Sequence, residues 1–287
     1  MRSGLRAGAA VLAAAGVAIA AAACTGGAPG TAGVPRVTGT PGGGGATGAA
    51  IPAIPASPRY RTTAPAGTGD HNLLMAGWTD PSNGYNVRQN MWACPNHCGT
   101  QTLWAQSSSN WGVVSDQPDG NTAVLSYPDV QYILTQANGD PAPLSGFTMI
   151  TSSFSQSMPS SGDFEAAYDI WLNNWNTEVM IWTDNHGQQP AGAPVPAAVL
   201  DGQTWTLWAG SGTSGGYPSG PFSFVLQGNE TAGTVNILAA LDYLMSHGYI
   251  PSNSAINDVE YGWEICSTNG QAEDFQMQSF VLHTQVK

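Results

Sequence analysis

The chain predicts an all-β fold, an antiparallel sandwich with one packed α-helix, and three observations support this expectation. Short runs rich in Val, Ile, Trp, Tyr and Phe recur along residues 67–287, separated by clusters of Gly, Pro, Asn and Ser. Several runs alternate between apolar and polar residues, which is the period of a strand with two different faces. One stretch, Val235 to His247, instead repeats its large apolar residues three and four apart, and Gly248 can end the helix that this spacing predicts.

The first 24 residues have the features of an export signal. Arg2 and Arg6 form a short positive segment, and an apolar run extends from Ala9 to Ala23. This run is too short and too rich in Ala to predict a membrane span. The small residues before Cys24 are similar to a bacterial lipoprotein cleavage site, although the usual Leu is absent. We therefore expect a secreted protein, either released or anchored to the outer face of the bacterial membrane by a lipid on Cys24.

Residues 25–66 consist mainly of Gly, Ala, Pro and Thr, with few large apolar side chains. Such a segment cannot bury a core, so we expect a disordered linker. All ten Trp and all nineteen acidic residues follow it. Residues 67–287 are therefore expected to form one domain of ordinary size for a β-sandwich.

Acidic residues dominate the predicted domain. From residue 61 onward the basic side chains are Arg61, Arg88 and Lys287, against nineteen acidic ones. A protein that binds polyphosphate needs many Lys and Arg residues. Nucleic acid and anionic membrane surfaces are therefore excluded as partners.

Three cysteines follow Cys24. Cys94 and Cys98 bracket a loop-like stretch and could close a short disulfide in an oxidising compartment. A metal site of Cys94, His97, Cys98 and Cys266 is the alternative, but its spacing matches no common zinc pattern. We expect Cys266 to be a buried thiol.

The strand predicted at residues 168–173 has two different faces. Tyr168, Ile170 and Leu172 share one face, which we assign to the core. Asp169 and Trp171 share the other. This second face is turned away from the core.

Two further strands place a glutamate among apolar or aromatic neighbours. In residues 178–182, Glu178 shares its face with Met180 and Trp182, and in residues 261–266 Glu264 lies opposite a core face of Tyr261, Trp263 and Ile265. Burial there would raise the pKa of a carboxyl, and a sugar ring could stack nearby. From spacing alone, the alternative is a pair of ordinary glutamates on half-exposed strands.

A series of short motifs occurs in one order along residues 84–283. They are Asn90-Met91-Trp92, Ser126-Tyr127-Pro128, Ala167 to Leu172, Glu178 to Trp182, Pro190-Ala191-Gly192, Gly202 to Trp205, Phe222 to Val225 and Tyr261 to Ile265. The series resembles glycoside hydrolase family 12, small endoglucanases that fold as a β-jelly roll. The resemblance implies two antiparallel sheets with a concave substrate cleft.

The resemblance also implies three catalytic roles. Glu178 matches the nucleophile, Glu264 matches the acid/base, and Asp169 matches an aspartate that orients the nucleophile. Family members retain the anomeric configuration, which requires two carboxyls about 5–5.5 Å apart. Glu178 is expected to be ionised and Glu264 to be protonated.

Substrate contacts follow from the same resemblance. Asn90 and Trp92 match residues that bind sugar on the non-reducing side of the cleaved bond. Met180, Trp182 and Trp171 are expected to line the floor, and the loop at Pro190 to lie over the cleft. Trp175 has two interpretations, a platform at the cleft rim or a plug of the hairpin. The family uses no cofactor and no metal, and we expect a monomer.

Departures from the family pattern lie at the ends of the cleft. They are Ala93, Leu125, a short connection from Trp171 to Glu178 and the Cys94 to Cys98 insertion, and they leave the preferred polymer open. Glu260, next to Tyr261, is expected to be exposed to solvent.

The sequence thus predicts a retaining endo-β-1,4-glucanase that acts on cellulose or mixed-linkage β-glucan. A xyloglucan-specific enzyme and a non-catalytic carbohydrate-binding protein at the cell surface are the alternatives. A polysaccharide lyase would need an Arg, Tyr and His set, and the domain has too few basic side chains to supply it.

Overall fold

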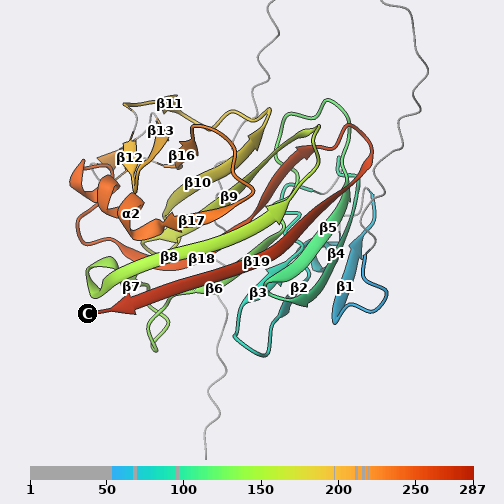
Figure 1. The fold of residues 1–287 in the computed structure, drawn as a ribbon, viewed down its shortest axis with the longest axis horizontal. Coiled ribbons are helices and arrows are strands. Elements are labelled where there is room, and N and C mark those ends of the chain that lie inside the picture. The colour runs from blue at the N-terminus through green and yellow to red at the C-terminus, as the bar shows by residue number, and fades with distance from the viewer. Residues whose placement is uncertain are drawn as a thin grey trace, which may run out of the picture.

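Two β-sheets packed face to face form the protein in the computed structural model (Figure 1). The structure describes residues 54–66, 70–94, 97–196, 198–210, 213–214, 217–218 and 220–287. The predicted export segment, Cys24 and the predicted linker up to residue 53 lie outside the described residues. The observed architecture confirms the predicted all-β jelly-roll sandwich.

The outer sheet has six strands and is antiparallel throughout, in the order β1-β4-β5-β19-β8-β17. Its strands are β1 (Tyr60–Ala64), β4 (Thr100–Ser107), β5 (Asn110–Asp116), β8 (Phe147–Ser157), β17 (Ala232–Asn236) and β19 (Ala272–Val286). In Figure 1 β8 and β19 cross in front of the second sheet.

The inner sheet has eleven strands, and its main path runs β11-β13-β16-β10-β9-β18-β6-β3-β2, with β12 on β13 and β7 on β18. Its strands are β2 (Gly77–Thr79), β3 (Asn86–Arg88), β6 (Asp129–Ile133), β7 (Ala142–Pro143), β9 (Asp163–Leu172), β10 (Thr177–His186), β11 (Ala193–Pro194), β12 (Ala198–Leu200), β13 (Gln203–Ala209), β16 (Phe222–Leu226) and β18 (Ala255–Ser267). A separate pair comprises β14 (Thr213–Ser214) and β15 (Tyr217–Pro218).

One pair of strands departs from the antiparallel pattern. β10 and β16 run parallel, with Val179 opposite Phe222 and Trp182 opposite Val225. A parallel pair needs a long connection. That connection carries residues 187–221, including Pro190 and β13.

The apolar faces predicted from alternation meet between the sheets. The core contains Tyr168, Ile170 and Leu172 of β9, together with the apolar residues of one face of β10 and β18. Its ring contacts include Tyr168 with Tyr261, whose centroids are 4.4 Å apart. The face assignments of these three strands are therefore confirmed.

The predicted helix is α2 (Ile237–Ser246), and it packs its apolar side on the core through Ile237, Leu241 and Leu244. The Asn236 side chain caps it by accepting a hydrogen bond from the Ala239 amide at 3.1 Å. Short helical turns, α1 (His71–Leu74) and η1 (Leu144–Gly146), accompany the strands. None of the described helices is long and apolar enough to cross a membrane.

The end of the predicted linker belongs to the fold. Residues 60–64 form β1 and pair with β4 along their whole length. Ala64 is fully buried, and Tyr60 packs against the core between the sheets. The predicted boundary at residue 66 is therefore wrong for this stretch, because alternating burial of small and aromatic side chains is enough to hold an edge strand.

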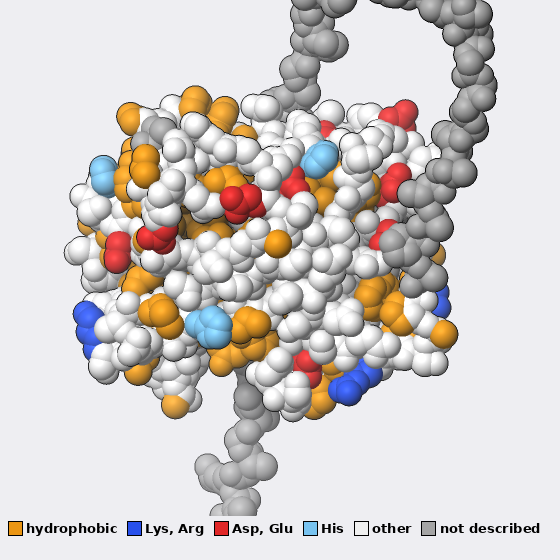
Figure 2. All heavy atoms as spheres, viewed as in Figure 1, with side chains coloured by type: hydrophobic (Ala, Val, Ile, Leu, Met, Phe, Trp, Pro, Cys, Tyr) orange, Lys and Arg blue, Asp and Glu red, His pale blue; other side chains and the backbone are white. Residues whose placement is uncertain are grey.

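The outer sheet presents a polar but weakly charged surface. Figure 2 shows this side of the molecule, with hydrophobic atoms in small scattered groups and few Lys or Arg side chains. Strands such as β8 alternate buried residues with Ser and Thr. The acidic residues that matter for chemistry are on the other face of the inner sheet.

Candidate active site

Three neighbouring strands, β10, β9 and β18, carry the acidic face of the inner sheet. Glu178 on β10 lies opposite Trp171 on β9. Glu264 on β18 lies opposite Glu165 on β9, and Asp169 lies between these two rows. The residues that the sequence separates by long stretches are therefore brought to one surface by the pairing of β9 with both neighbours.

A cavity of about 660 Å³, including its open mouth, covers this surface. Its lining includes six of the predicted site residues. The full lining is Met75, Arg88, Asn90, Trp92, Tyr127, Asp169, Trp171, Trp175, Glu178, Glu260 and Glu264.

Glu178 and Glu264 are almost buried, with 8% and 7% of their surface exposed. Burial, and then the charges of Glu264 and Glu260, raise the pKa of Glu178 to about 8. Burial raises the pKa of Glu264 to about 7. The pair therefore holds at least one proton near neutral pH, as a nucleophile and acid/base pair must. Because the pKa of Glu178 lies above that of Glu264, these values do not assign the proton to Glu264, and the predicted separation of roles stays a prediction.

Asp169 is buried beside this pair. Its Oδ2 accepts a hydrogen bond from Trp171 Nε1 at 3.1 Å, which fixes both side chains on the cleft face. Burial, and then the charge of Glu178, raise the pKa of Asp169 well above its usual value. Asp169 and Glu178 thus interact electrostatically, in agreement with an aspartate that influences the nucleophile.

A charged network that the sequence did not predict lies beside the catalytic strands. Arg88 Nε contacts Asp129 Oδ1 at 2.9 Å, and Arg88 Nη2 contacts Glu260 Oε2 at 2.6 Å. Gln131 Nε2 donates to Glu260 at 2.9 Å and to Asp258 at 2.7 Å. Glu260 is buried, so the expectation that it is exposed is wrong. The missed signal was its alternation with Glu264, which puts both on one face.

The network is balanced by one guanidinium. Burial alone would lower the pKa of Arg88, but the charges of Asp129 and Glu260 raise it, so that Arg88 stays charged. Burial raises the pKa of Asp129 to about 7, although Arg88 opposes this shift. Arg88 therefore compensates carboxylates that would otherwise be unpaired.

Glu165 is a second residue that the sequence did not indicate. It is fully buried on β9, opposite Glu264. In the sequence Glu165 precedes a run of apolar residues and has no distinguishing neighbour. Its significance depends on the register between β9 and β18, which no local pattern reveals.

Asn90 and Trp92 form one arm of the cleft. Asn90 has a left-handed backbone (φ 41°), and its Nδ2 donates to Asp129 Oδ2 at 3.0 Å. The Asn90 carbonyl accepts from the Tyr127 amide at 2.8 Å. Trp92 packs on Val124 and Cys266 and keeps part of its ring exposed. The arm therefore presents an aromatic ring to the cavity on a fixed backbone.

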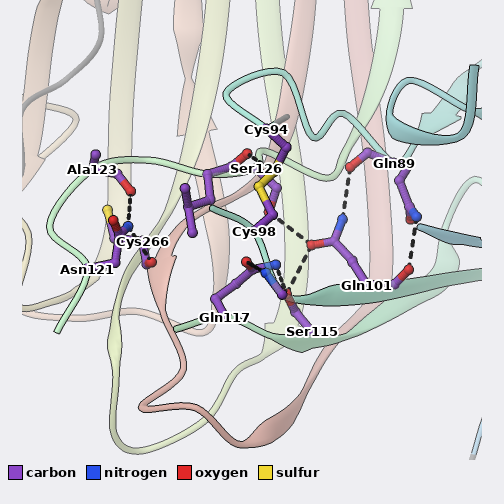
Figure 3. Close-up of a disulfide and its surroundings, with 12 residues drawn as sticks. Gln89, Cys94, Cys98, Gln101, Ser115, Gln117, Asn121, Ala123, Ser126 and Cys266 are labelled. Carbon is purple, nitrogen blue, oxygen red and sulfur yellow. Dashed lines mark hydrogen bonds between the residues drawn. A yellow bond between two sulfur atoms is a disulfide. The ribbon is translucent and has the colours of Figure 1, made fainter. Parts of the chain in front are cut away.

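The predicted disulfide joins Cys94 to Cys98, whose Cα atoms are 5.6 Å apart (Figure 3). The two sulfurs are bonded to each other, so they cannot serve as the thiolates of the alternative metal site. Both cysteines pack with Leu125 and Ala64 next to the arm. Cys266 is buried but disulfide-bonded, so the expectation of a thiol is wrong.

Buried amides hold the arm to the outer sheet. The side chains of Gln89 and Gln101 each donate to the backbone carbonyl of the other, at 3.0 and 2.9 Å. Gln101 Oε1 accepts from Ser115 and Ser126, at 3.1 and 2.9 Å. Figure 3 shows this network beside the disulfide. These hydrogen bonds connect the segments next to Asn90 and Tyr127 to β4 and β5 of the outer sheet.

Three predicted substrate contacts are more deeply placed than expected. Met180 and Trp182 are on the cleft face, but they are buried and pack with Ala167 below the cavity lining. Pro190 is also buried, and it does not line the cavity. Trp182 and Met180 therefore support the floor.

Trp175 stands at the tip of the hairpin between β9 and β10. Asn173, Asn174 and Trp175 all have left-handed backbones, with φ of 55°, 57° and 64°. The Trp175 amide donates to Asn257 Oδ1 at 3.3 Å, and its ring centre is 6.3 Å from that of Trp171. Because strain of this kind is kept where the surroundings hold it, the half-buried ring is fixed at the cavity edge.

Gly262 allows β6 to approach β18 closely. It lies opposite Asp129, and a Cβ atom at this position would overlap the Pro128 carbonyl oxygen. The Trp263 amide donates to that same carbonyl at 3.2 Å. A glycine is therefore required between Glu260 and Glu264.

The sequence profile of glycosyl hydrolase family 12 matches residues 83–285, which include every residue of the acidic face. The protein is a family 12 glycoside hydrolase. Its two sheets, helix and cleft agree with that family's jelly roll. It is thus a cellulase-like enzyme that hydrolyses β-glucans.

Relatives of this family 12 hydrolase are distant in sequence but similar in fold. Endoglucanase S of Pectobacterium parmentieri is 28% identical over 231 residues, covering 74% of this chain and 85% of that protein. The xyloglucanase domain of NopAA from Sinorhizobium fredii, solved with cellobiose, is 25% identical with a TM-score of 0.65, covering 80% of this chain and all of that one. The family 12 xyloglucanase of Bacillus licheniformis is 24% identical with the same TM-score, covering 79% of this chain and 100% of that chain.

Proposed function

We propose that this enzyme is a retaining endo-β-1,4-glucanase that hydrolyses internal bonds of neutral, unbranched β-glucan. The observation that carries the proposal is the pair Glu178 and Glu264, nearly buried, electrostatically coupled and lining one open cavity with Trp92. An open cavity accepts the middle of a polymer. The pair supplies the two carboxyls that double displacement needs.

In the first step Glu178, as the carboxylate, attacks the anomeric carbon while Glu264 donates its proton to the leaving glycosidic oxygen. In the second step Glu264 takes a proton from water, which attacks the anomeric carbon and releases Glu178. Bound sugar excludes water from the cavity, which strengthens these charge interactions. Asp169, held by Trp171, would orient Glu178 and repel a second negative charge.

The charges of the cleft favour a neutral polymer. Among the residues that the structure describes, four carboxyl groups line the cavity, those of Asp169, Glu178, Glu260 and Glu264, together with a single guanidinium, that of Arg88. A chain of uronates would add negative charge to this surface without finding cations to pair with. Aromatic side chains such as Trp92 and Trp171 instead offer faces on which pyranose rings can stack.

The names of the relatives support glucans as the substrate class. The Pectobacterium relative is called an endoglucanase, and the Sinorhizobium relative is called a xyloglucanase and was solved with cellobiose. The proposed preference for unbranched β-glucan must therefore be measured against branched xyloglucan.

The test is release of reducing ends from mixed-linkage β-glucan, hydroxyethylcellulose and xyloglucan by the wild type and by Glu178→Gln. We expect turnover of the first two by the wild type, a fall in viscosity that precedes extensive sugar release, and loss of activity in the variant. Glu273→Gln, on β19 of the outer sheet, is the matched control. Wild-type binding without turnover would instead identify a carbohydrate-binding protein, and faster turnover of xyloglucan would identify a xyloglucanase.

The roles of the two glutamates are separable by azide rescue of alanine variants on an aryl β-cellobioside. Azide replacing the Glu178 carboxylate should give the α-glycosyl azide, whereas azide acting on the glycosyl intermediate of Glu264→Ala should give the β-azide. If Glu178→Ala gave the β-azide and Glu264→Ala the α-azide, Glu264 would be the nucleophile and Glu178 the acid/base. Proton NMR of the first product of the wild type should show the β-anomer, and an initial α-anomer would exclude retention.

We also propose that the enzyme acts outside the cell as a monomer. The export features of residues 1–24 and the Cys94–Cys98 disulfide support an oxidising compartment. Mass spectrometry of the mature N-terminus distinguishes a lipid on Cys24 from simple cleavage, and a cytoplasmic full-length chain would contradict export. Light scattering tests the monomer.

A further inference from the structure

Glu165 and Glu264 form a carboxyl pair that the double-displacement mechanism does not use as such. The two residues are directly opposite in the register of β9 and β18, and Glu165 has no exposed surface. Both oxygens of Glu165 and one oxygen of Glu264 are buried without a hydrogen-bond partner in the described part of the chain, and each carboxyl shifts the pKa of the other. Glu165 therefore lies beside the group assigned as acid/base.

No other described side chain supplies a hydrogen bond to Glu165. Neither of its carboxyl oxygens, nor the buried Oε2 of Glu264, has a hydrogen-bond partner among the described residues. Asn185, opposite Glu165 on β10, instead uses its side chain to bind the Gln188 backbone, at 3.0 and 3.1 Å. Among the described side chains, the one placed to pair with the buried oxygens of each carboxyl is the other carboxyl, through a hydrogen bond between them.

Two ionised carboxylates cannot form this hydrogen bond, because both would only accept. One of the two groups must carry a proton. Glu165 is the deeper group, and burial followed by the charge of Glu264 raises its pKa well above the usual value. Glu165 is therefore the donor, and the bond lowers the pKa of Glu264 from the value that burial alone would give.

We propose that Glu165 is a positioning residue for Glu264: it remains a neutral acid, donates a hydrogen bond to the buried oxygen of Glu264, and leaves the other oxygen for the glycosidic oxygen and then for water. This role rests on the proposed hydrolytic function. Glu165 keeps its own proton throughout, so it neither gains nor loses an atom in the cycle.

The backbone supports the same arrangement. Gln188 Nε2 donates to the Glu264 carbonyl at 2.8 Å, which fixes the strand from the loop side. Glu165 fixes the side chain from the floor side. With the backbone and one carboxyl oxygen of Glu264 held in this way, its other carboxyl oxygen is left to face the cavity.

Other ionisable groups belong to the cleft and its charged network, and the test must separate them from Glu165. They are Asp169 on β9, Glu178 on β10, Asp258 and Glu260 on β18, Asp129 on β6 and Arg88 on β3. Each of these remains in place when Glu165 alone is changed.

The experiment compares the pH dependence of kcat/KM for the wild type, Glu165→Gln and Glu165→Leu on a cellobioside with a poor leaving group. Gln keeps a donor, so its alkaline limb should coincide with that of the wild type. Leu removes the donor, so the ionised form of Glu264 loses a hydrogen bond of the stronger, charge-assisted kind. The pKa of Glu264, and with it the alkaline limb, should rise by about one pH unit, which makes Glu264 a tenfold weaker acid. Asp184→Asn, a buried carboxyl of β10 paired with His186, controls for loss of a buried acid and should not move the limb.

A dinitrophenyl cellobioside needs no acid to expel its leaving group, so the difference between the Leu variant and the wild type should vanish on this substrate. An unchanged alkaline limb in Glu165→Leu, or a shift that is equal on both substrates, would overturn the positioning role. Circular dichroism and the melting temperature establish that each variant is folded.

Carboxyl carbon NMR of the wild type provides a readout that does not need the Leu variant. One glutamate signal, absent in Glu165→Gln, should stay at the chemical shift of a protonated acid from pH 5 to 7. Titration of that signal to the ionised shift in this range would refute the proposal. Absence of any hydrolysis by the wild type would refute the proposed function. The NMR spectrum would still decide whether Glu165 stays protonated, as its role as a hydrogen-bond donor to Glu264 requires.

Discussion

The nucleophile is expected to cost stability, so replacing Glu178 by Gln should stabilise the fold as it removes activity. The unfolded chain ionises a glutamate near pH 4.3, whereas the pKa of Glu178 in the folded protein is about 8. A raised pKa contributes stability that is complete below the unfolded value and is lost as pH rises through the folded value. The wild type should therefore lose stability with rising pH, and Gln should not incur this loss.

The magnitude follows from the two pKa values. Keeping the proton on Glu178 at pH 7 costs about 1.4 kcal/mol for each unit above 4.3, so the cost is on the order of 3–4 kcal/mol as an upper limit. At pH 4 it is close to zero. With about 3 °C per kcal/mol for a domain of this size, the melting temperature of Glu178→Gln should exceed that of the wild type by about 10 °C at pH 7.

Urea titrations of both proteins at pH 4, 5, 6, 7 and 8 measure the gap in the free energy of unfolding. The gap should open steadily with pH, while activity of the variant falls by at least about a thousandfold. Glu273→Gln, half exposed on the outer sheet, controls for the substitution itself. A gap that is constant with pH, or a variant less stable than the wild type at pH 8, would refute the reasoning.

Three further substitutions test other parts of the cleft. Arg88→Met should lower the free energy of unfolding by about 3–5 kcal/mol at pH 8, since it leaves buried carboxylates unpaired; urea titration measures this, and exposed Arg61→Met should change it little. An equal loss in both variants would contradict the network. Replacing Cys94 and Cys98 by Ala should cost about 2 kcal/mol, measured by urea titration, because the disulfide closes a short loop, and an unchanged stability would contradict this. Trp175→Ala should raise KM for long cello-oligosaccharides two- to tenfold, since a ring contact is worth about 0.5–1.5 kcal/mol; lost stability with an unchanged KM would identify the ring as a plug of the hairpin.

Alternation along the strands was sufficient to predict much of the site. The faces of Asp169, Glu178 and Glu264 depend only on the period of a strand, which any sequence displays directly. The helix at α2 was equally visible, because its apolar spacing differs from that of every strand around it. The resemblance to family 12 then supplied the roles that spacing cannot assign.

Features that depend on register or on distant partners were not visible. Glu165 matters because it faces Glu264 across β9 and β18, and Arg88 because it meets carboxylates from two other strands. Alternation with Glu264 shows which face Glu260 lies on, but the pairing with Arg88 that buries it has no local signal. Cys266 shows no partner in its neighbouring residues, so its bonded state was also missed.

The missing side chain at Gly262 makes one dimension of the cleft rigid. Backbone meets backbone there, with the Pro128 carbonyl in the space that any Cβ atom would need. The floor therefore cannot be widened by side-chain rotation or by a conservative substitution at this position, and its width is fixed once β6 and β18 have paired. Engineering this enzyme for bulkier glucans should begin at the rim, with Trp92 and Trp175, where the spacing between walls is still carried by side chains.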